Sequence, residues 1–148
     1  MADRPRLRGV GIGAGYFAPF QYEAWARIPE VEIVALYNRT EERARPLMAE
    51  YGVARYYGIN ADELKGKSRH KQIVEPRQLA MYLLREDAHL STPEIGRLLN
   101  RDHTTVLHGL KQVVNDIARD GPSRAAVRGV REVIAGGSRR DHADAPAA

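Results

Sequence analysis

The stretch STPEIGRLLNRDHTTVLHGLKQVVNDI, residues 91 to 117, contains two helix starts that follow each other closely. Ser91 with Glu94 has the spacing of a capping box, in which each residue satisfies a backbone N–H of the other. Asp102 has the position of an N-cap for a second helix, after only a two-residue turn. Two short helices joined by a tight turn, the second with small polar groups near its start, predict a helix-turn-helix.

The second helix of this stretch is predicted to have one apolar and one polar side. Its apolar stripe recurs at helical spacing, and Leu107 and Val114 are expected to widen it; the central members are Val106, Leu110, Val113 and Ile117. Thr104 and His108 lie nearly opposite the stripe, and Thr105 lies beside them. Threonine methyls can contact thymine methyls, and a histidine can donate to a purine acceptor. The polar side therefore fits the major groove, and ordinary solvated helix residues are the alternative that periodicity leaves open.

The segment before the helix-turn-helix is basic and then helical. KGKSRHK, residues 65 to 71, alternates basic and small polar residues, and a helix is predicted over residues 76 to 86. Pro76 is placed in its first turn, where the missing N–H has no cost. The side chains expected to be buried are Leu79, Met81, Tyr82 and Leu83.

Charge and composition limit the function. The 148 residues carry a net charge of +4, with 8 Lys/Arg against 9 Asp/Glu in residues 1–64 and 15 against 10 in residues 65–148. A basic second half suits phosphate neutralisation, although many basic domains bind no nucleic acid. The chain has no cysteine and its histidines are scattered, so no metal site is expected. No apolar run could span a bilayer, so we expect no membrane association and a cytoplasmic, nucleoid-associated protein.

The string RDHTTVLH closely resembles the recognition helix of the C-terminal DNA-binding domain, domain IV, of the bacterial chromosomal replication initiator DnaA. The resemblance covers residues 53–117 and includes VARYYGI, DELKGKSR, IVEPRQLAMYLLRE and PEIG. It implies binding to double-stranded DNA at a DnaA-box-like site, for replication or for regulation, with protein partners unknown. By this resemblance Arg69 enters a minor groove, Arg77 and Gln78 hold phosphates, and one helix reads bases. The implied DNA-binding residues are Lys67, Arg69, Arg77, Gln78, Thr92, Pro93, Asp102, His103, Thr104, Thr105 and His108.

Two departures from that family affect the prediction. The family usually has one more residue in the turn, Gly-Gly-Arg-Asp-His, where this chain has Asn100, Arg101, Asp102 and His103. The helix spacing or the preferred site could therefore differ. ATPase motifs are not found, so we expect the protein to bind DNA without ATPase activity and not to be an enzyme.

The first half predicts the opening of a nucleotide-binding fold. A strand over residues 7–12 leads into GAGYFA, a helix is expected over 19–28, and a second strand over 31–37 follows. Gly13, Gly15 and Ala18 have the G-x-G-x-x-A spacing, which permits a tight turn against a pyrophosphate. Turn glycines without a ligand are the alternative interpretation.

Residues 8–64 resemble the start of the glucose–fructose oxidoreductase and inositol dehydrogenase family, in GIGAGYFAPFQYEAW and ALYNRTEERARPLMAEYGVARYY. In such folds Asn38 would lie at the ribose, and Arg39 would suit the 2′-phosphate of NADP. The Glu-Lys-Pro segment that the family needs for catalysis is not found, nor is a substrate domain. An inactive NAD(P)-binding fragment is thus the alternative function; no cofactor is expected, with NADP as the one candidate.

Both families account for YGVARYYGINADEL, residues 51 to 64. Its apolar side chains, Val53, Tyr56, Tyr57 and Ile59, can cover the helix at 76–86, whereas a third parallel strand would need a buried continuation that KGKSRHK cannot supply. We therefore predict a mainly α fold, a helix-turn-helix bundle preceded by a partial Rossmann-like βαβα segment. The predicted boundaries are residues 1–52 for the incomplete Rossmann-like segment, 53–135 for the DNA-binding domain and 136–148 for a disordered tail.

Overall fold

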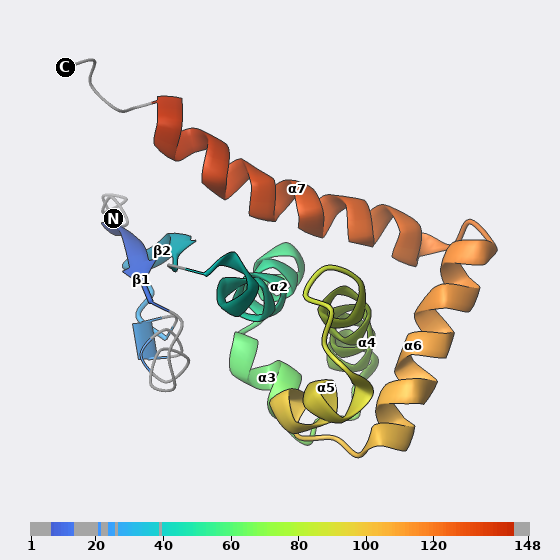
Figure 1. Cartoon of the computed structure of the whole chain (residues 1–148). Coiled ribbons are helices and arrows are strands. Elements are labelled where there is room, and N and C mark those ends of the chain that lie inside the picture. The colour runs from blue at the N-terminus through green and yellow to red at the C-terminus, as the bar shows by residue number, and fades with distance from the viewer. Residues whose placement is uncertain (1–6, 14–20, 22–23, 26, 39, 144–148) are drawn as a thin grey trace.

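The structure is a computed structural model that describes residues 7–13, 21, 24–25, 27–38 and 40–143. Its elements are β1 (Leu7–Ile12), β2 (Val31–Tyr37), α2 (Glu41–Tyr57), α3 (Ala61–Lys65), α4 (Lys71–Glu86), α5 (Thr92–Leu99), α6 (His103–Ala118) and α7 (Pro122–Ala143). The described part is mainly helical, as predicted. Figure 1 shows the helices as one bundle with the two strands beside it.

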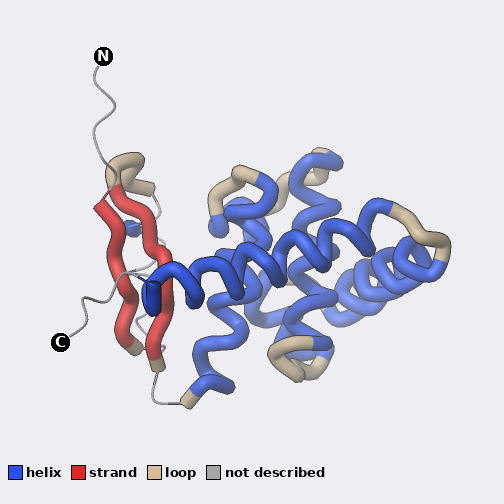
Figure 2. The backbone as a smooth tube through the Cα atoms, turned by 90° about the horizontal axis from the view of Figure 1, so that it is seen from above, coloured by secondary structure: helices blue, strands red, loops and turns tan. Residues whose placement is uncertain are grey.

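The two strands pair in parallel at one end of the molecule (Figure 2). Their bounds agree with the sequence prediction, and Leu7 pairs with Val31 at one end of the ladder and Ile12 with Tyr37 at the other. The sheet nevertheless has only two strands in the described part, and Leu7 and Ile12 are 69% and 81% exposed. A parallel sheet is normally buried on both faces. A Rossmann-like unit is therefore not shown, and half of the helix expected over 19–28 lies outside the described residues.

Helix α2 contains the first half of the segment 51–64 that two families accounted for. It runs without interruption from Glu41 to Tyr57 and ends at Gly58, whose φ of 64° lies in the left-handed region. Leu47 and Val53, which lie on either side of the predicted boundary, are both buried. Tyr56 and Tyr57 are 41% and 36% exposed, so they cover less of the bundle than their apolar rings predicted.

The core lies around α4, which packs against α2 and α6 (Figure 1). Helix α6 approaches α4 closely at Gly109, where a Cβ would lie 2.6 Å from Sδ of Met81. The fully buried side chains come from every helix of the bundle and include Val53, Leu64, Leu83, Leu84, Ile95, Leu99, Val106 and Val130. Burial of this apolar surface is the main stabilising contribution.

Helix α4 begins earlier than predicted. Its first residue is Lys71 and its N-cap is His70, so Pro76 lies inside the helix rather than in its first turn. Proline has no N–H to donate to the carbonyl four residues earlier. The ring of Pro76 is fully buried, and its packing offsets that missing bond.

Helix α7 continues to Ala143, into residues 136–143 for which disorder was predicted. The segment lacks apolar periodicity, but a helix that is already nucleated adds further turns at little cost even in a polar sequence. Residues 144–148 lie outside the described part. In the described residues, no helix combines the length and the apolar character needed to cross a membrane.

Candidate nucleic-acid interface

The first helix of the helix-turn-helix, α5, starts at the predicted capping box. Oε2 of Glu94 accepts the backbone N–H of Ser91 at 2.7 Å, and Oγ of Ser91 accepts the N–H of Glu94 at 3.4 Å. The hydroxyl of Ser91 lowers the pKa of Glu94 by donating to its carboxylate. Ile95 and Leu99 are fully buried, so α5 is fixed to the bundle by its apolar side. Pro93 and the start of α5 remain at the surface, with Thr92 partly buried.

The turn between α5 and α6 depends on a glycine and on a left-handed residue. Asn100 has φ 54° and ψ 53°, and the N–H of Arg101 donates to the carbonyl of Gly96 at 2.8 Å. A Cβ on Gly96 would lie 2.5 Å from the carbonyl oxygen of Arg101. Asparagine tolerates the left-handed region better than most residues. The turn is thus as short as the sequence predicted and has no space for a side chain at Gly96.

Asp102 caps the second helix, α6, and orients its first two threonines. Its Oδ1 accepts the backbone N–H of Thr105 at 2.8 Å, and its Oδ2 accepts the Thr105 hydroxyl at 3.0 Å. The hydroxyl of Thr104 also donates to Oδ1. These hydrogen bonds lower the pKa of Asp102 from 3.8 to about 2, and the one from the Thr104 hydroxyl has the largest effect. Both threonine hydroxyls consequently use their protons on Asp102 and present acceptor lone pairs and methyl groups to the solvent.

Helix α6 shows its polar side to solvent as predicted, but its apolar stripe is narrower. His103, Thr104, Thr105 and His108 are exposed, whereas Val106, Gly109 and Val113 are buried. Leu107 and Val114 are 52% and 50% exposed, so the prediction that they widen the buried stripe was wrong. They lie at the edge of the stripe, and helix periodicity does not determine how much of that edge the neighbouring helix covers.

A basic loop, residues 66–70 between α3 and α4, lies beside this helix pair. Lys67 and Arg69 are exposed. Arg77, in α4, is only 5% exposed and lies beneath the loop. Its guanidinium donates to four carbonyl oxygens, those of Leu64 at 2.7 Å, Gly66 at 2.9 Å, Ser68 at 3.0 Å and Glu63 at 3.1 Å.

These contacts direct the guanidinium of Arg77 at the protein backbone, whereas the resemblance implied a phosphate contact for it. A guanidinium has five N–H donors, and in Arg77 they make four hydrogen bonds to the backbone of α3 and of the loop. Burial, followed by the nearby charge of Arg101, lowers the pKa of Arg77. Gln78, the second expected phosphate contact, is partly buried, and its side chain lies where α4 meets Gly109.

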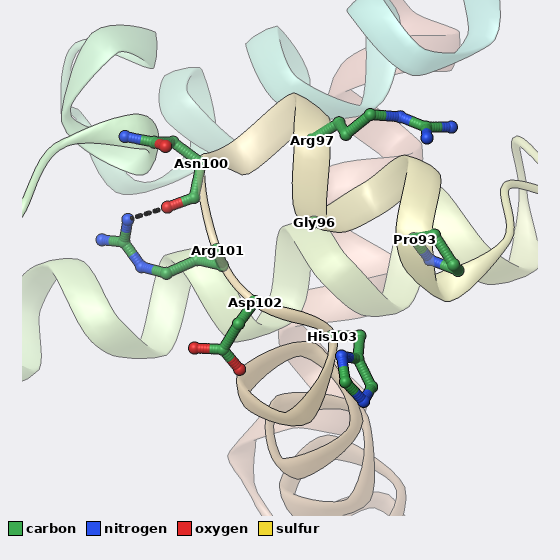
Figure 3. A pocket seen from close by; sticks show the side chains of 7 residues that line it. All are labelled: Pro93, Gly96, Arg97, Asn100, Arg101, Asp102 and His103. Atoms are coloured by element: carbon green, nitrogen blue, oxygen red, sulfur yellow. Dashed lines mark hydrogen bonds between the residues drawn. The ribbon is translucent and has the colours of Figure 1, made fainter.

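An open hollow of about 600 Å³ lies at the turn itself (Figure 3). It brings together the start of α5, the turn and the start of α6; its lining residues are Pro93, Gly96, Arg97, Asn100, Arg101, Asp102 and His103. Arg97 was missed by sequence reasoning because a charge on an exposed helix face has no distinctive pattern. In the described part of the chain, Lys67, Arg69, Arg97 and Lys111 take part in none of the ion pairs.

The residues expected to hold a nucleotide are only partly described. Gly13 has a φ of 94°, which suits the tight turn that the sequence predicts after β1. The amide of Asn38 donates to the carbonyl of Thr40 at 2.7 Å. Gly15, Ala18 and Arg39 lie outside the described residues. Within the described residues, no group of three or more potential metal ligands occurs.

Helices α5 and α6, their short turn and the exposed polar start of α6 define a helix-turn-helix. Comparison with protein families matches residues 51–113 to the bacterial dnaA protein helix-turn-helix. The similarity thus includes the basic loop, Arg77 and the start of α6.

Individual relatives agree with that family. The chain is 46% identical over 91 residues to the chromosomal replication initiator protein DnaA of Thermomicrobium roseum, an alignment that covers 61% of this chain and 20% of the relative. The protein of the same name from Chloroflexus aggregans is 43% identical over 83 residues, covering 55% and 17%. That from Caldanaerobacter subterraneus is 37% identical over 99 residues, covering 67% and 22%.

The chain spans about a fifth of the length of these curated relatives. The matches support the DnaA-type part of the sequence prediction. They give no support to the oxidoreductase resemblance of residues 8–64.

Proposed function

We propose that this protein binds double-stranded DNA sequence-specifically through its DnaA-type helix-turn-helix, without ATPase activity. The observation that carries the proposal is the presence of two exposed groups on one helical bundle. One is the polar start of α6, with His103, Thr104, Thr105 and His108, and the other is the basic loop with Lys67 and Arg69. A helix that enters a major groove and an arginine that enters the adjacent minor groove together read a short, asymmetric site.

The chemistry of the α6 start supports base reading. The threonine hydroxyl protons are engaged by Asp102, so each oxygen is an acceptor for an amino group of adenine or cytosine. Their methyl groups can contact a thymine methyl. His103 and His108 add donors on the same exposed side.

The supporting cations have a different part in the proposal. Lys67, Arg97 and Lys111 neutralise phosphates, which positions the protein but does not select a sequence, whereas Arg69 enters the minor groove. Thr92 and Pro93 approach the backbone at the start of α5. Arg77 holds the backbone of the loop rather than DNA. Gln78 contacts a phosphate with the exposed part of its side chain, because the rest is buried against α6.

Fluorescence anisotropy with two duplexes tests this function. One duplex carries a DnaA-box-type site and the other a scrambled site of equal composition, each at two salt concentrations. We expect a preference for the box of tenfold or more, on the order of 1.4 kcal/mol. Equal and strongly salt-dependent binding to both duplexes would mean that the chain binds only the phosphate backbone.

A second candidate is binding of NADP by the first segment. The parallel pairing of β1 with β2 and the left-handed Gly13 favour it. Tryptophan fluorescence with added NADP, using Trp25, tests it in the full chain. A fluorescence change that saturates with NADP in the wild type would support nucleotide binding. Gly15→Trp adds a second tryptophan, so NADP binding to this variant is measured by calorimetry, and it should be lost.

A further inference from the structure

The turn residue Arg101 connects the helix-turn-helix to the basic loop. Its Nη1 donates to the carbonyls of Asn100 at 2.6 Å and Leu99 at 3.4 Å, and its Nη2 donates to the carbonyl of Gly66. Figure 3 shows its side chain extending to the opposite side of the turn from Pro93 and His103. Arg101 directly precedes Asp102, the cap that orients the first threonines of α6.

Gly66 is held from two sides. The carbonyl that accepts from Arg101 also accepts from Nη2 of Arg77 at 2.9 Å. The remaining contacts of Arg77 fix Glu63, Leu64 and Ser68. The backbone on both sides of Lys67 is therefore tied to α4 through Arg77, and Gly66 is also tied to the turn before α6 through Arg101.

From these contacts we infer that Arg101 is a positioning residue: it sets the distance between the basic loop and the start of α6, and so the spacing between the two parts of the DNA site, without contacting DNA. The inference rests on the proposed function for its DNA consequence. The carbonyls of residues 66, 99 and 100 carry the partial negative charge that holds the guanidinium, and Arg101 is only partly exposed.

This role differs in its consequences from a phosphate contact. A phosphate contact acts alone, so its loss adds to the loss of any other contact. A positioning residue acts through the side chain that it places, so its loss has little further effect once that side chain is absent. Arg69, three residues after Gly66 on the tied loop, is that side chain.

A double-mutant cycle of Arg69→Ala and Arg101→Ala, measured by anisotropy in the full chain, distinguishes the two roles. We expect Arg101→Ala to weaken binding to the box duplex on the order of tenfold in the wild type but less than about twofold in the Arg69→Ala background. Arg97→Ala, which removes a neighbouring exposed arginine, is the matched control and should give the same loss in both backgrounds. Equal losses from Arg101→Ala in both backgrounds would overturn the inference.

A second readout needs no DNA. Hydrogen exchange of the backbone amides of residues 67–70 should accelerate in Arg101→Ala and in Arg101→Lys, because a lysine has no fork to bridge several carbonyls. Amides in α7 are the internal reference, and circular dichroism verifies that the variants are folded. Unchanged exchange in the loop would overturn the inference even if the wild type binds the box. Conversely, a wild-type chain without preference for the box would refute the proposed function, while the loop exchange would still decide whether Arg101 positions the loop.

Discussion

The carboxylate of Asp102 binds Thr105 twice, accepting its backbone N–H at 2.8 Å and its hydroxyl at 3.0 Å. One residue thus ends the turn, starts α6 and sets the direction of a side chain on the exposed surface. The cap and the candidate reading position are therefore one structural unit, and a change in either alters the other.

The pKa of Asp102 provides the first prediction. Its folded value of about 2 lies below the ordinary value of 3.8, so its carboxylate stabilises the fold above pH 3.8 and this contribution is lost as the pH falls toward 2. Carbon-detected NMR titration should give a midpoint of about 2. Asp102→Asn retains a capping side chain but cannot be protonated, so its free energy of unfolding should fall less between pH 3.8 and pH 2 than that of the wild type. A midpoint near 3.8 would mean that the carboxylate does not hold the threonines.

Gly96→Ala should destabilise the helix-turn-helix by about 1–3 kcal/mol, because its Cβ would meet the carbonyl oxygen of Arg101 at 2.5 Å. Backbone cannot move aside as a flexible side chain can. Gly66→Ala is the control: its φ of −70° suits alanine and its nearest neighbour lies at 3.5 Å, so the free energy of unfolding should change by less than about 1 kcal/mol. Urea denaturation of both variants measures the difference, and similar values for the two would contradict the geometry of the turn.

The same substitution at two leucines measures the packing of the helix pair. Leu99→Ala should cost about 2–5 kcal/mol, because this side chain is fully buried. Leu107→Ala should cost about 1 kcal/mol or less, since Leu107 is 52% exposed. Thermal unfolding of the two variants gives the comparison. A larger loss for Leu107 would mean that α6 is rotated relative to the arrangement described.

Thr105→Ala should weaken binding to the box duplex by about 1 kcal/mol and relax discrimination at one base pair. A panel of duplexes with single base-pair changes, measured by anisotropy, identifies that position. Thr105→Ser keeps the hydroxyl and removes the methyl, and it separates the two contributions. If Thr105→Ala lost as much affinity for scrambled DNA as for the box, a base-reading role for Thr105 would be refuted.

Arg69→Ala should weaken binding to all duplexes and lower the slope of log affinity against log salt by about 0.9. The arginine is exposed, and no ion pair in the described part of the chain competes for it. Arg124→Ala, on α7 and paired with Asp120, is the control and should leave the slope unchanged. An unchanged slope for Arg69→Ala would remove Arg69 from the phosphate and groove contacts.

The helix-turn-helix could be predicted from the sequence because its determinants are local. The capping box of Ser91 and Glu94 and the cap of Asp102 lie within three residues of the backbone groups that they satisfy. The start of α4 could not be predicted in the same way. Pro76 is a strong signal for a helix start, and only packing in the bundle permits the helix to begin at Lys71.

The candidate site was predictable to a different extent for each kind of residue. Periodicity assigned Thr104, Thr105 and His108 to one exposed side of α6. The buried contacts of Arg77 and the bridge from Arg101 to Gly66 depend on segments distant in the sequence, and no local pattern encodes them. The oxidoreductase resemblance is not supported by the comparisons, and a local strand–turn–strand pattern does not determine whether a whole sheet follows.

Helix α2 has a practical consequence for dividing the chain. The match to the bacterial dnaA helix-turn-helix family starts at residue 51, yet the helix starts at Glu41, and Ala44, Leu47 and Ala49 in its first turns are buried. A fragment cut at the homology boundary would leave α7 and α4 facing solvent where those turns had been. The smallest autonomous fragment should therefore begin before Glu41, at least ten residues upstream of the start of the family match.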